Sequence, residues 1–229
     1  MSEEGDIVGD IFGWIGTVLT TFFLITPIVP LLKLMKGEMT VKEYPGVLLI
    51  CSFMNCVLWA DYGLLNDRFL QYFPNGLGGS ITLVFITTFL IYLAEKKIPF
   101  VLLYNLCSLA VICGITFLFF QVIDADVTGI IAVVFNILIY AAPGEKIYTV
   151  FKTGNYELIP IWSTIGGCAC SACWLIYGLY LPDINVIIPN LLGIIASVIQ
   201  IIVYLTFKKK AQSKEVDGAI INPEEEKNA

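Results

Sequence analysis

Amide and aromatic side chains recur at helical spacing inside two apolar stretches of the chain. Asn55 and Trp59 are four residues apart, as are Cys170 and Trp174, which places each pair on one face of a helix. A carboxamide donates and accepts the hydrogen bonds that hydroxyl groups require, and an indole can stack on the apolar C–H face of a sugar ring. Two facing stripes of this kind predict a pocket for a neutral polyol. The alternative for the tryptophans is the interfacial aromatic belt.

A pair of asparagines follows prolines within apolar segments. Asn75 and Asn190 stand one residue after Pro74 and Pro189, where the missing proline N–H frees the carbonyl four residues back. A single membrane asparagine is as often a contact between helices, worth about 0.6 kcal/mol, as it is a ligand contact. Because the whole Pro-Asn and Trp pattern occurs twice, the sequence favours a pocket that binds hydroxyl groups.

Four further prolines form a second duplicated set. Pro45 and Pro160 open apolar segments, where proline is tolerated because a first-turn N–H has no partner within the helix. Pro27 and Pro143 lie inside segments, toward the ends that carry lysine. The interior pair predicts bends that act as hinges of a gate, and the alternative is ordinary helix starts and kinks.

Asp61 is the one carboxylate inside an apolar segment, and intramembrane acids are functional candidates. The alternative is a side chain that reaches water at the nearby membrane surface. A proton-coupled carrier uses a relay of acids or histidines at the membrane midplane. The chain has no histidine and no acid at the depth of Asn75 and Asn190, so passive facilitation is the expectation.

Neither a metal site nor an enzyme is indicated by the motifs. Cys168, Cys170 and Cys173 form a C-x-C-x-x-C run, but no histidine or further cysteine cluster completes four ligands. The chain contains no G-x-S-x-G, no G-x-x-x-x-G-K-[ST] and no H-E-x-x-H. We therefore expect no metal, no cofactor and no enzymatic activity.

The elements that position these residues are membrane helices. The 229 residues are 58% hydrophobic and 14% charged, with a mean hydropathy of +0.84, unlike soluble domains. Seven apolar stretches reach the roughly 20 residues that cross a hydrocarbon core: residues 11–32, 45–65, 69–93, 99–123, 127–150, 159–181 and 184–207. Residues 130–142 are apolar on every face, unlike the alternating strands of a barrel. The sequence predicts an all-α integral membrane protein with seven transmembrane helices.

Positive charges gather on one side of this bundle. The lysines follow segments that end on the same side: Lys33, Lys36, Lys42, Lys96, Lys97, Lys146, Lys152, Lys208, Lys209, Lys210, Lys214 and Lys227. The other side carries Arg68 and the acidic N-terminus. The positive-inside bias therefore places the N-terminus outside and the C-terminus in the cytoplasm. The net charge of −6 argues against a nucleic acid partner, and the lipid bilayer is the expected environment.

The chain contains two copies of one unit. A shift of 115 or 116 residues superposes Gly13 on Gly129, Pro27 on Pro143, Trp59 on Trp174, Tyr62 on Tyr177, Asn75 on Asn190 and Gly78 on Gly193. Residues 1–97 hold the first three helices, 98–126 a linker helix, 127–210 the second three helices and 211–229 a disordered cytoplasmic tail. Parallel repeats with a site between them near the midplane are a known transporter plan.

Five motifs carry a resemblance to a known family. They are T-P-I-V-P at residues 26–30, N-C-V-L-W-A-D-Y-G at 55–63, A-A-P at 141–143, C-W-L-I-Y-G at 173–178 and P-N-L-L-G at 189–193. Over residues 10–208 the chain resembles the SWEET sugar transporter family. The resemblance implies two parallel three-helix bundles joined by a linker helix. It also implies bidirectional, ion-independent uniport of mono- or disaccharides by alternating access.

The same resemblance implies roles for individual residues. The substrate-binding residues would be Asn75, Asn190, Trp59, Trp174, Asn55, Cys170, Thr20 and Asn136. The cytoplasmic gate would be formed by Pro27, Pro45, Pro143 and Pro160, and the outer gate by Tyr62, Asp61, Tyr177 and Asp183. Thr20 and Asn136 are of medium size at a level where side-chain bulk influences sugar size in this family, which favours a glucose-like hexose.

Two other functions stay open. PQ-loop relatives of the family move amino acids or act as receptors, although their Pro-Gln dipeptide is absent, since Ile28 follows Pro27 and Gly144 follows Pro143. Transport of an amino acid or another small solute is the second hypothesis. A heptahelical receptor is the third, but it does not predict two superposable halves. The resemblance further implies self-association into a homo-oligomer, and the plasma membrane is favoured over an endomembrane.

Overall fold

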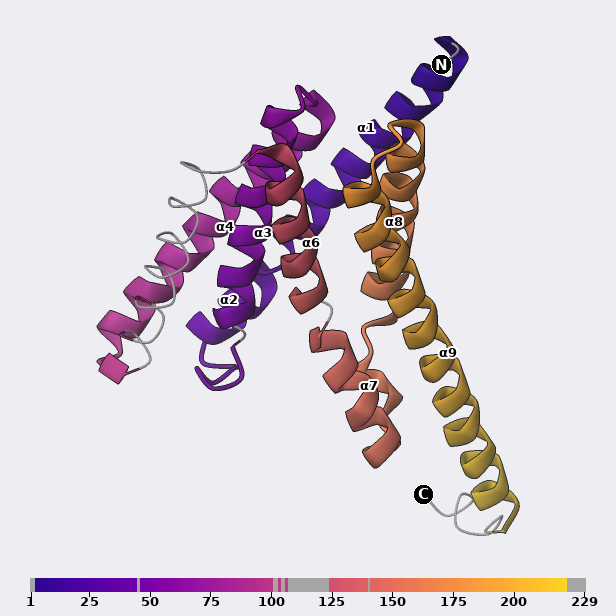
Figure 1. Ribbon diagram of the computed structural model, residues 1–229. Coiled ribbons are helices and arrows are strands. Elements are labelled where there is room, and N and C mark those ends of the chain that lie inside the picture. Colours follow the sequence, from indigo (N-terminus) through magenta and orange to yellow (C-terminus); the bar gives the residue numbers. More distant parts are fainter. Residues whose placement is uncertain are drawn as a thin grey trace.

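The computed structural model describes residues 3–44, 46–100, 103, 106, 124–139 and 141–221. Every regular element in these ranges is helical (Figure 1). The helices are α1 (Glu3–Ile25), α2 (Ile28–Met35), α3 (Gly46–Leu65), α4 (Phe69–Glu95), α6 (Ala125–Ile139), α7 (Ala141–Thr153), α8 (Ile161–Tyr180) and α9 (Ile184–Ile221), with a 3-10 helix at Tyr156–Leu158. The predicted all-α class is confirmed. Most of the expected linker helix, residues 98–126, lies outside the described residues.

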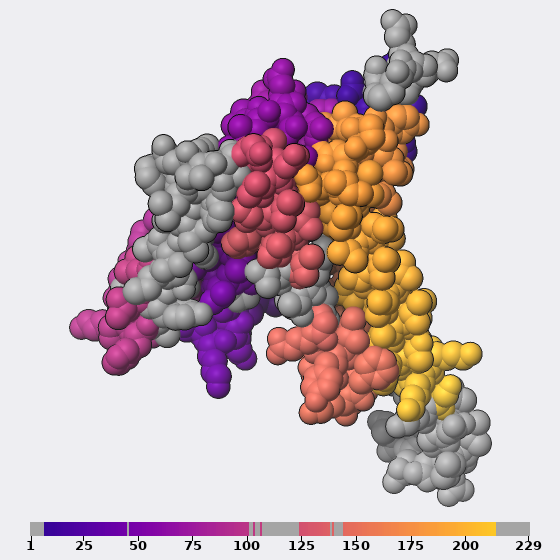
Figure 2. Space-filling view, viewed as in Figure 1, coloured from indigo at the N-terminus to yellow at the C-terminus, as the bar shows by residue number. Residues whose placement is uncertain are grey.

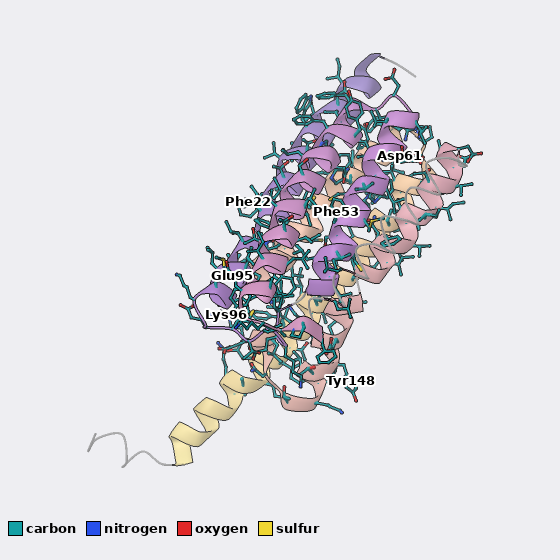
Figure 3. All side chains as sticks on the ribbon, turned by 90° about the vertical axis from the view of Figure 1, so that its left-hand side faces the viewer. Phe22, Phe53, Asp61, Glu95, Lys96 and Tyr148 are labelled. Carbon is teal, nitrogen blue, oxygen red and sulfur yellow. The ribbon has the colours of Figure 1, made fainter. Side chains whose placement is uncertain are left out.

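Several helices are long and apolar enough to cross a membrane. Within the described ranges there are five: Ile7–Met35, Gly46–Leu65, Phe69–Glu95, Ile161–Tyr180 and Ile184–Ser213. A shorter apolar helix covers Ala125–Ile137. Large apolar side chains cover the outer faces of these helices, as Phe22 of α1 does with 67% of its surface exposed (Figure 3). Such surfaces suit contact with lipid chains.

The expected segment at 127–150 is helical wherever the structure describes it. α6 covers its first part and α7 its second, on either side of residue 140, which lies outside the described residues. Pro143 lies in α7.

Pro27 interrupts the first membrane span, at the place where the sequence predicts a hinge. Proline has no N–H to donate to the carbonyl four residues earlier, which is that of Phe23. This carbonyl accepts instead from Thr26, whose N lies at 3.1 Å and whose Oγ1 lies at 2.7 Å. α1 ends at Ile25 and α2 begins at Ile28, so the span consists of two helices in succession.

Two groups of three helices cross one another. The first group is α1, α3 and α4, and the second is α6, α8 and α9. α1 of the first group packs along α8 of the second, and α6 of the second group packs along α3 of the first. The two groups are therefore in contact through two pairs of helices. In Figure 1, α3 and α4 lie on the left, α8 and α9 lie on the right, and the indigo α1 reaches the upper right beside α8. Figure 2 shows the surface of α6 between the two sides.

The hydrophobic cores differ between the two ends of the bundle. At the end where α3 meets α4, here called the N-terminal end, one cluster joins both groups: Leu58, Trp59, Tyr62, Leu70, Ala132, Tyr177 and Val186. At the opposite, lysine end each group has a cluster of its own, around Phe89 and Leu93 in the first and around Val150 and Val203 in the second. Figure 3 shows Asp61 toward the N-terminal end and Lys96 at the lysine end.

α9 runs further than the sequence led us to expect. The disordered tail was expected from Ala211, whereas α9 continues to Ile221. Lysine, alanine and glutamine at residues 208–212 have high helix propensity, and no proline occurs before Pro223. Residues 222–229 lie outside the described residues.

A buried tyrosine anchors the connection between α2 and α3 at the lysine end. Tyr44 is 6% exposed, and its ring centroid lies 4.4 Å from that of Phe89. Its hydroxyl has no hydrogen-bond partner among the described residues. Burial raises the pKa of Tyr44 to about 12. In the same loop, the N–H and hydroxyl of Thr40 donate to Glu43, each at 2.8 Å, and lower the pKa of that carboxyl.

Candidate functional site

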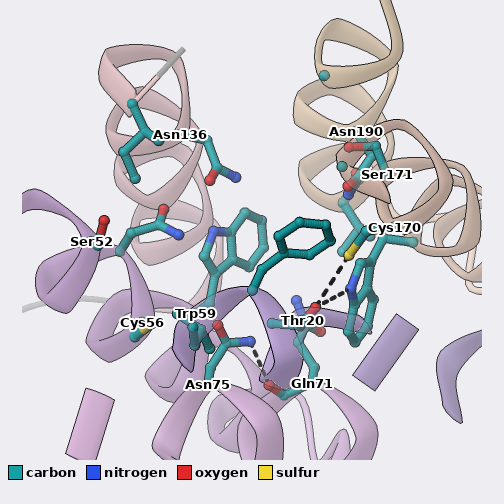
Figure 4. A pocket seen from close by; sticks show the side chains of 18 of the residues that line it. Thr20, Ser52, Cys56, Trp59, Gln71, Asn75, Asn136, Cys170, Ser171 and Asn190 are labelled. Carbon is teal, nitrogen blue, oxygen red and sulfur yellow. Dashed lines mark hydrogen bonds between the residues drawn. The ribbon is translucent and has the colours of Figure 1, made fainter. Parts of the chain in front are cut away.

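A cavity of about 420 Å³ lies between the two groups of helices (Figure 4). Its walls include all eight residues that the sequence proposed for substrate binding: Thr20, Asn55, Trp59, Asn75, Asn136, Cys170, Trp174 and Asn190. Each group contributes four of them. No lysine, arginine, aspartate or glutamate of the described residues lines the cavity, and this suits an uncharged ligand.

The two asparagines that follow prolines have the same geometry. Asn75 Nδ2 donates to the backbone carbonyl of Gln71 at 2.8 Å, and Asn190 Nδ2 donates to that of Val186 at 2.7 Å. Each bond uses one amide hydrogen and fixes the side chain against its own helix. No other described residue bonds to either side chain, so the carbonyl oxygen and the second amide hydrogen of each asparagine remain for a ligand. In Figure 4 they approach the cavity from opposite sides.

The carbonyl freed by Pro74 has found a partner on another helix. Thr17 Oγ1 of α1 donates to the backbone carbonyl of Leu70 at 3.3 Å. Leu70 stands four residues before the buried Pro74, so its carbonyl would otherwise lack the helical bond. This bond joins α1 to α4 beside the cavity and steadies the helix that carries Asn75.

The two tryptophans have matching positions but different bonds. Trp59 packs edge-on against Tyr62 with ring centroids 5.6 Å apart, and Trp174 packs likewise against Tyr177 at 5.3 Å. Trp174 Nε1 donates to the hydroxyl of Thr20 at 2.8 Å. Trp59 makes no such bond with any described residue. Thr20 also lies 3.5 Å from the sulfur of Cys170, so three expected site residues form one network.

Two buried acceptors in the cavity wall have no partner. Asn55 Oδ1 and Gln71 Oε1 are both inaccessible to solvent and make no hydrogen bond with the described residues. Native proteins rarely leave such groups unsatisfied. Both residues line the cavity, so a rotation of either amide would bring its oxygen to the contents of the cavity. Asn55 was expected in the site, whereas Gln71 was missed. The available signal was its spacing of one helical turn before Asn75.

A polar network closes the N-terminal end of the cavity. The Tyr62 hydroxyl donates to Asp183 Oδ2 at 2.8 Å, and the same oxygen pairs with the guanidinium of Arg68. Asn185 Nδ2 donates to the Tyr62 hydroxyl at 3.3 Å. Tyr62 and Asp183 belong to the expected outer gate, and Arg68 is an addition to it. Asp61 makes no hydrogen bond or ion pair with the described residues.

Glycines allow the two gate tyrosines to approach the opposite repeat. A Cβ added to Gly13 of α1 would lie 2.9 Å from the ring of Tyr177, and one added to Gly129 of α6 would lie 2.8 Å from the ring of Tyr62. Gly13 and Gly129 are equivalent positions in the repeat, as are the two tyrosines. The close packing of a glycine against a tyrosine of the expected outer gate is thus present twice, with the roles of the repeats exchanged.

Three of the four prolines expected at the lysine end lie in the part of the chain that the structure describes. Pro160 caps the start of α8, and Pro27 separates α1 from α2. Pro143 lies in α7, and Pro45 lies outside the described residues. The cavity extends toward this end as far as Ser163 of α8 and Ser197 of α9.

Comparison with known families decides what this arrangement is. The family model described as "Sugar efflux transporter for intercellular exchange" matches residues 10–97 and again residues 126–212. The chain belongs to the SWEET sugar transporter family. The two matched segments fall on the two expected repeats, and the cavity lies between them.

Individual SWEET proteins are similar over most of their length. The bidirectional sugar transporter SWEET5 of Arabidopsis thaliana is 28% identical over 215 residues, covering 90% of this chain and 89% of the relative. SWEET1 of the same plant is 28% identical over 221 residues, covering 93% and 89%. A solved eukaryotic SWEET transporter has a TM-score of 0.74 at 24% identity, covering 90% of this chain and 100% of that one, so the fold is shared.

Proposed function

We propose that this SWEET protein is a bidirectional facilitative sugar transporter that moves mono- or disaccharides by alternating access, with a glucose-like hexose as the preferred substrate. The observation that carries the proposal is the uncharged cavity between the repeats, with amide and indole groups on both sides. Its volume of about 420 Å³ is within the range of small-molecule sites. The names of the relatives support the substrate class.

Amide side chains bind the hydroxyl groups of the sugar, and indole side chains contact its ring. Asn75 and Asn190 each present a carbonyl oxygen and one N–H to hydroxyl groups, because their other N–H is held by the helix. Trp59 and Trp174 supply faces for the C–H surface of the ring. Thr20, Asn55, Asn136 and Cys170 complete the wall.

Access alternates between the two ends of the bundle. The conformation described here is closed at the N-terminal end by the shared core and by Tyr62, Arg68 and Asp183. At the lysine end the two groups have separate clusters, so their relative movement there breaks few packed contacts. The hinge at Pro27 and its counterparts Pro45, Pro143 and Pro160 would form the gate at that end.

Transport by this site needs no coupling ion. Among the described residues that line the cavity there is no acid, and the chain has no histidine to relay a proton. Asp183 is committed to Arg68 and Tyr62 at the N-terminal end. A neutral site whose described lining holds no carboxylate supports a uniporter.

The proposed setting is the plasma membrane, with the N-terminus outside and the lysine end in the cytoplasm. Lys33, Lys96 and Lys152 lie at the ends of helices on that side, as the positive-inside bias requires. The cavity would then open inward in the conformation described. Self-association into a homo-oligomer is part of the same proposal and comes from the family resemblance.

Uptake of radiolabelled glucose, fructose and sucrose into liposomes containing the purified protein tests the proposal. We expect saturable uptake of at least one sugar, unchanged by a pH gradient, and none in protein-free liposomes. Amino acids tested in the same vesicles address the second hypothesis. Uptake of an amino acid but of no sugar, by folded protein, would overturn the proposal.

A further inference from the structure

One polar residue of the cavity wall in the first repeat has an apolar residue as its counterpart in the second repeat. The shift of 115 residues that relates the repeats places Gln71 of α4 on Val186 of α9. Both residues line the cavity, and they are 3% and 2% exposed. The same shift places Asn55 on Cys170. On these helices the first repeat therefore presents two carboxamides that the second repeat lacks.

The amide of Gln71 is not explained by packing. Its backbone carbonyl accepts from Asn75, whereas its side-chain oxygen has no partner among the described residues. Val186, at the equivalent place, belongs to the core cluster that joins both repeats, so the fold accepts an apolar side chain there. A glutamine that served only to hold helices together would donate or accept across them.

A buried carbonyl oxygen without a partner calls for a donor. Because Gln71 lines the cavity, a rotation of its amide brings Oε1 to the contents of the cavity, which are water and the transported solute. Hydroxyl groups of a sugar supply such donors. Gln71 lies one helical turn before Asn75, so a sugar held by Asn75 lies beside it (Figure 4).

We infer that Gln71 is a substrate-contacting and specificity-determining residue, whose Oε1 accepts a hydrogen bond from one hydroxyl of the sugar. This inference rests on the proposed function. Because Val186 cannot replace that bond, the sugar binds in one orientation relative to the two repeats. Its hydroxyl-rich edge faces α4, and its less polar edge faces α9.

A hydroxyl scan tests the inference. Each monodeoxy analogue of glucose competes with labelled glucose for uptake into liposomes, first with the natural protein and then with Gln71→Leu. For the natural protein we expect one analogue to compete roughly tenfold more weakly than glucose, because it leaves Oε1 unpaired. With Gln71→Leu, that analogue and glucose should compete equally.

Gln200→Leu is the matched control. Gln200 is another buried glutamine, 8% exposed, on α9 and outside the cavity wall, where it accepts from Thr164 at 3.5 Å. Its replacement should leave the discrimination between analogues intact. Gln71→Val, which copies Val186, serves if Gln71→Leu does not fold.

The outcomes separate this inference from the proposed function. Sugar uptake with an unchanged analogue pattern in the Gln71 variants would overturn the role of Gln71 and leave the transporter intact. A natural protein that takes up glucose and all analogues equally would also overturn it. Absence of uptake of any sugar would refute the proposed function itself, and the inference with it.

Discussion

Arg68 and Asp183 occupy equivalent positions in the two repeats and form an ion pair with each other. They are 115 residues apart, which is the repeat shift itself. Equivalent backbone bonds place them, since Arg68 N donates to Gly63 O at 2.8 Å and Asp183 N donates to Gly178 O at 3.0 Å. Opposite charges at one repeat position therefore meet at the N-terminal end.

The symmetry of this position predicts rescue by exchange of the charges. Arg68→Asp or Asp183→Arg alone places like charges together, with side chains that are 19% and 4% exposed, and should lower sugar uptake about tenfold or more. The double variant restores the pair and should recover uptake to within about threefold of the natural protein. Tyr177, the counterpart of Tyr62, would then donate to the new carboxylate at position 68.

The control for the exchange is Asp67→Asn. Asp67 lies in the same turn and makes no ion pair with the described residues, so its neutralisation should leave uptake unchanged. A double variant as inactive as either single variant would contradict the symmetric gate.

Replacement of the paired asparagines should abolish transport without unfolding the protein. Asn75→Ala or Asn190→Ala removes hydroxyl partners from the cavity, and uptake should fall by about 100-fold. Thr82→Val is the matched control on α4. Among the described residues the Thr82 hydroxyl bonds only to Gly78 O of its own helix, at 2.7 Å, and Thr82 does not line the cavity. Full uptake in both asparagine variants would remove the basis for the pocket assignment.

The unequal bonds of the two tryptophans predict unequal effects of phenylalanine. Trp174→Phe keeps an aromatic face but loses the 2.8 Å bond to Thr20, and the KM for sugar should rise about fivefold. Trp59→Phe loses no bond to a described residue and should have a smaller effect. Concentration-dependent uptake measures both, and equal changes in KM would contradict the role of the Thr20 bond.

The raised pKa of Tyr44 predicts a loss of stability at alkaline pH. Burial raises the pKa of the Tyr44 phenol to about 12 in the folded protein, whereas its ordinary pKa is 10.0. Its contribution to stability is therefore complete below pH 10 and is lost as the pH rises toward 12. Tyr44→Phe should lack this dependence, and at neutral pH it should unfold at the same or a higher temperature, because the hydroxyl has no described partner.

Thermal unfolding in detergent, followed by tryptophan fluorescence, measures the effect of Tyr44. Tyr148→Phe is the control, since Tyr148 is 59% exposed at the same end. A large loss of stability in Tyr44→Phe at neutral pH would show that the hydroxyl has a partner.

Much of the fold and site could be predicted because the sequence pattern is duplicated. Asn75 and Asn190, or Trp59 and Trp174, stand out since each has a counterpart, and all four line the cavity. The same signal misses residues that break the symmetry. Gln71 has a valine as its counterpart, so the repeat does not mark it. Its apolar neighbours in the sequence do not show that its side chain is buried.

Other features depend on contacts that no local pattern reveals. Arg68 stood out only as the lone positive charge on its side, because its partner Asp183 lies a whole repeat away. The extension of α9 to Ile221 is a matter of a helix boundary. Apolar content predicts that a segment is helical far better than where the helix begins or ends.

Counterflow tests the central claim most directly. Liposomes that contain the protein are loaded with unlabelled sugar and diluted into a trace of the same sugar carrying a radiolabel. A uniporter whose single site alternates between the two sides should accumulate label transiently above its equilibrium level, with and without a pH gradient, and Asn75→Ala should show no such overshoot. Label that only rises to equilibrium in the natural protein, or an overshoot that persists in Asn75→Ala, would contradict alternating access through this cavity.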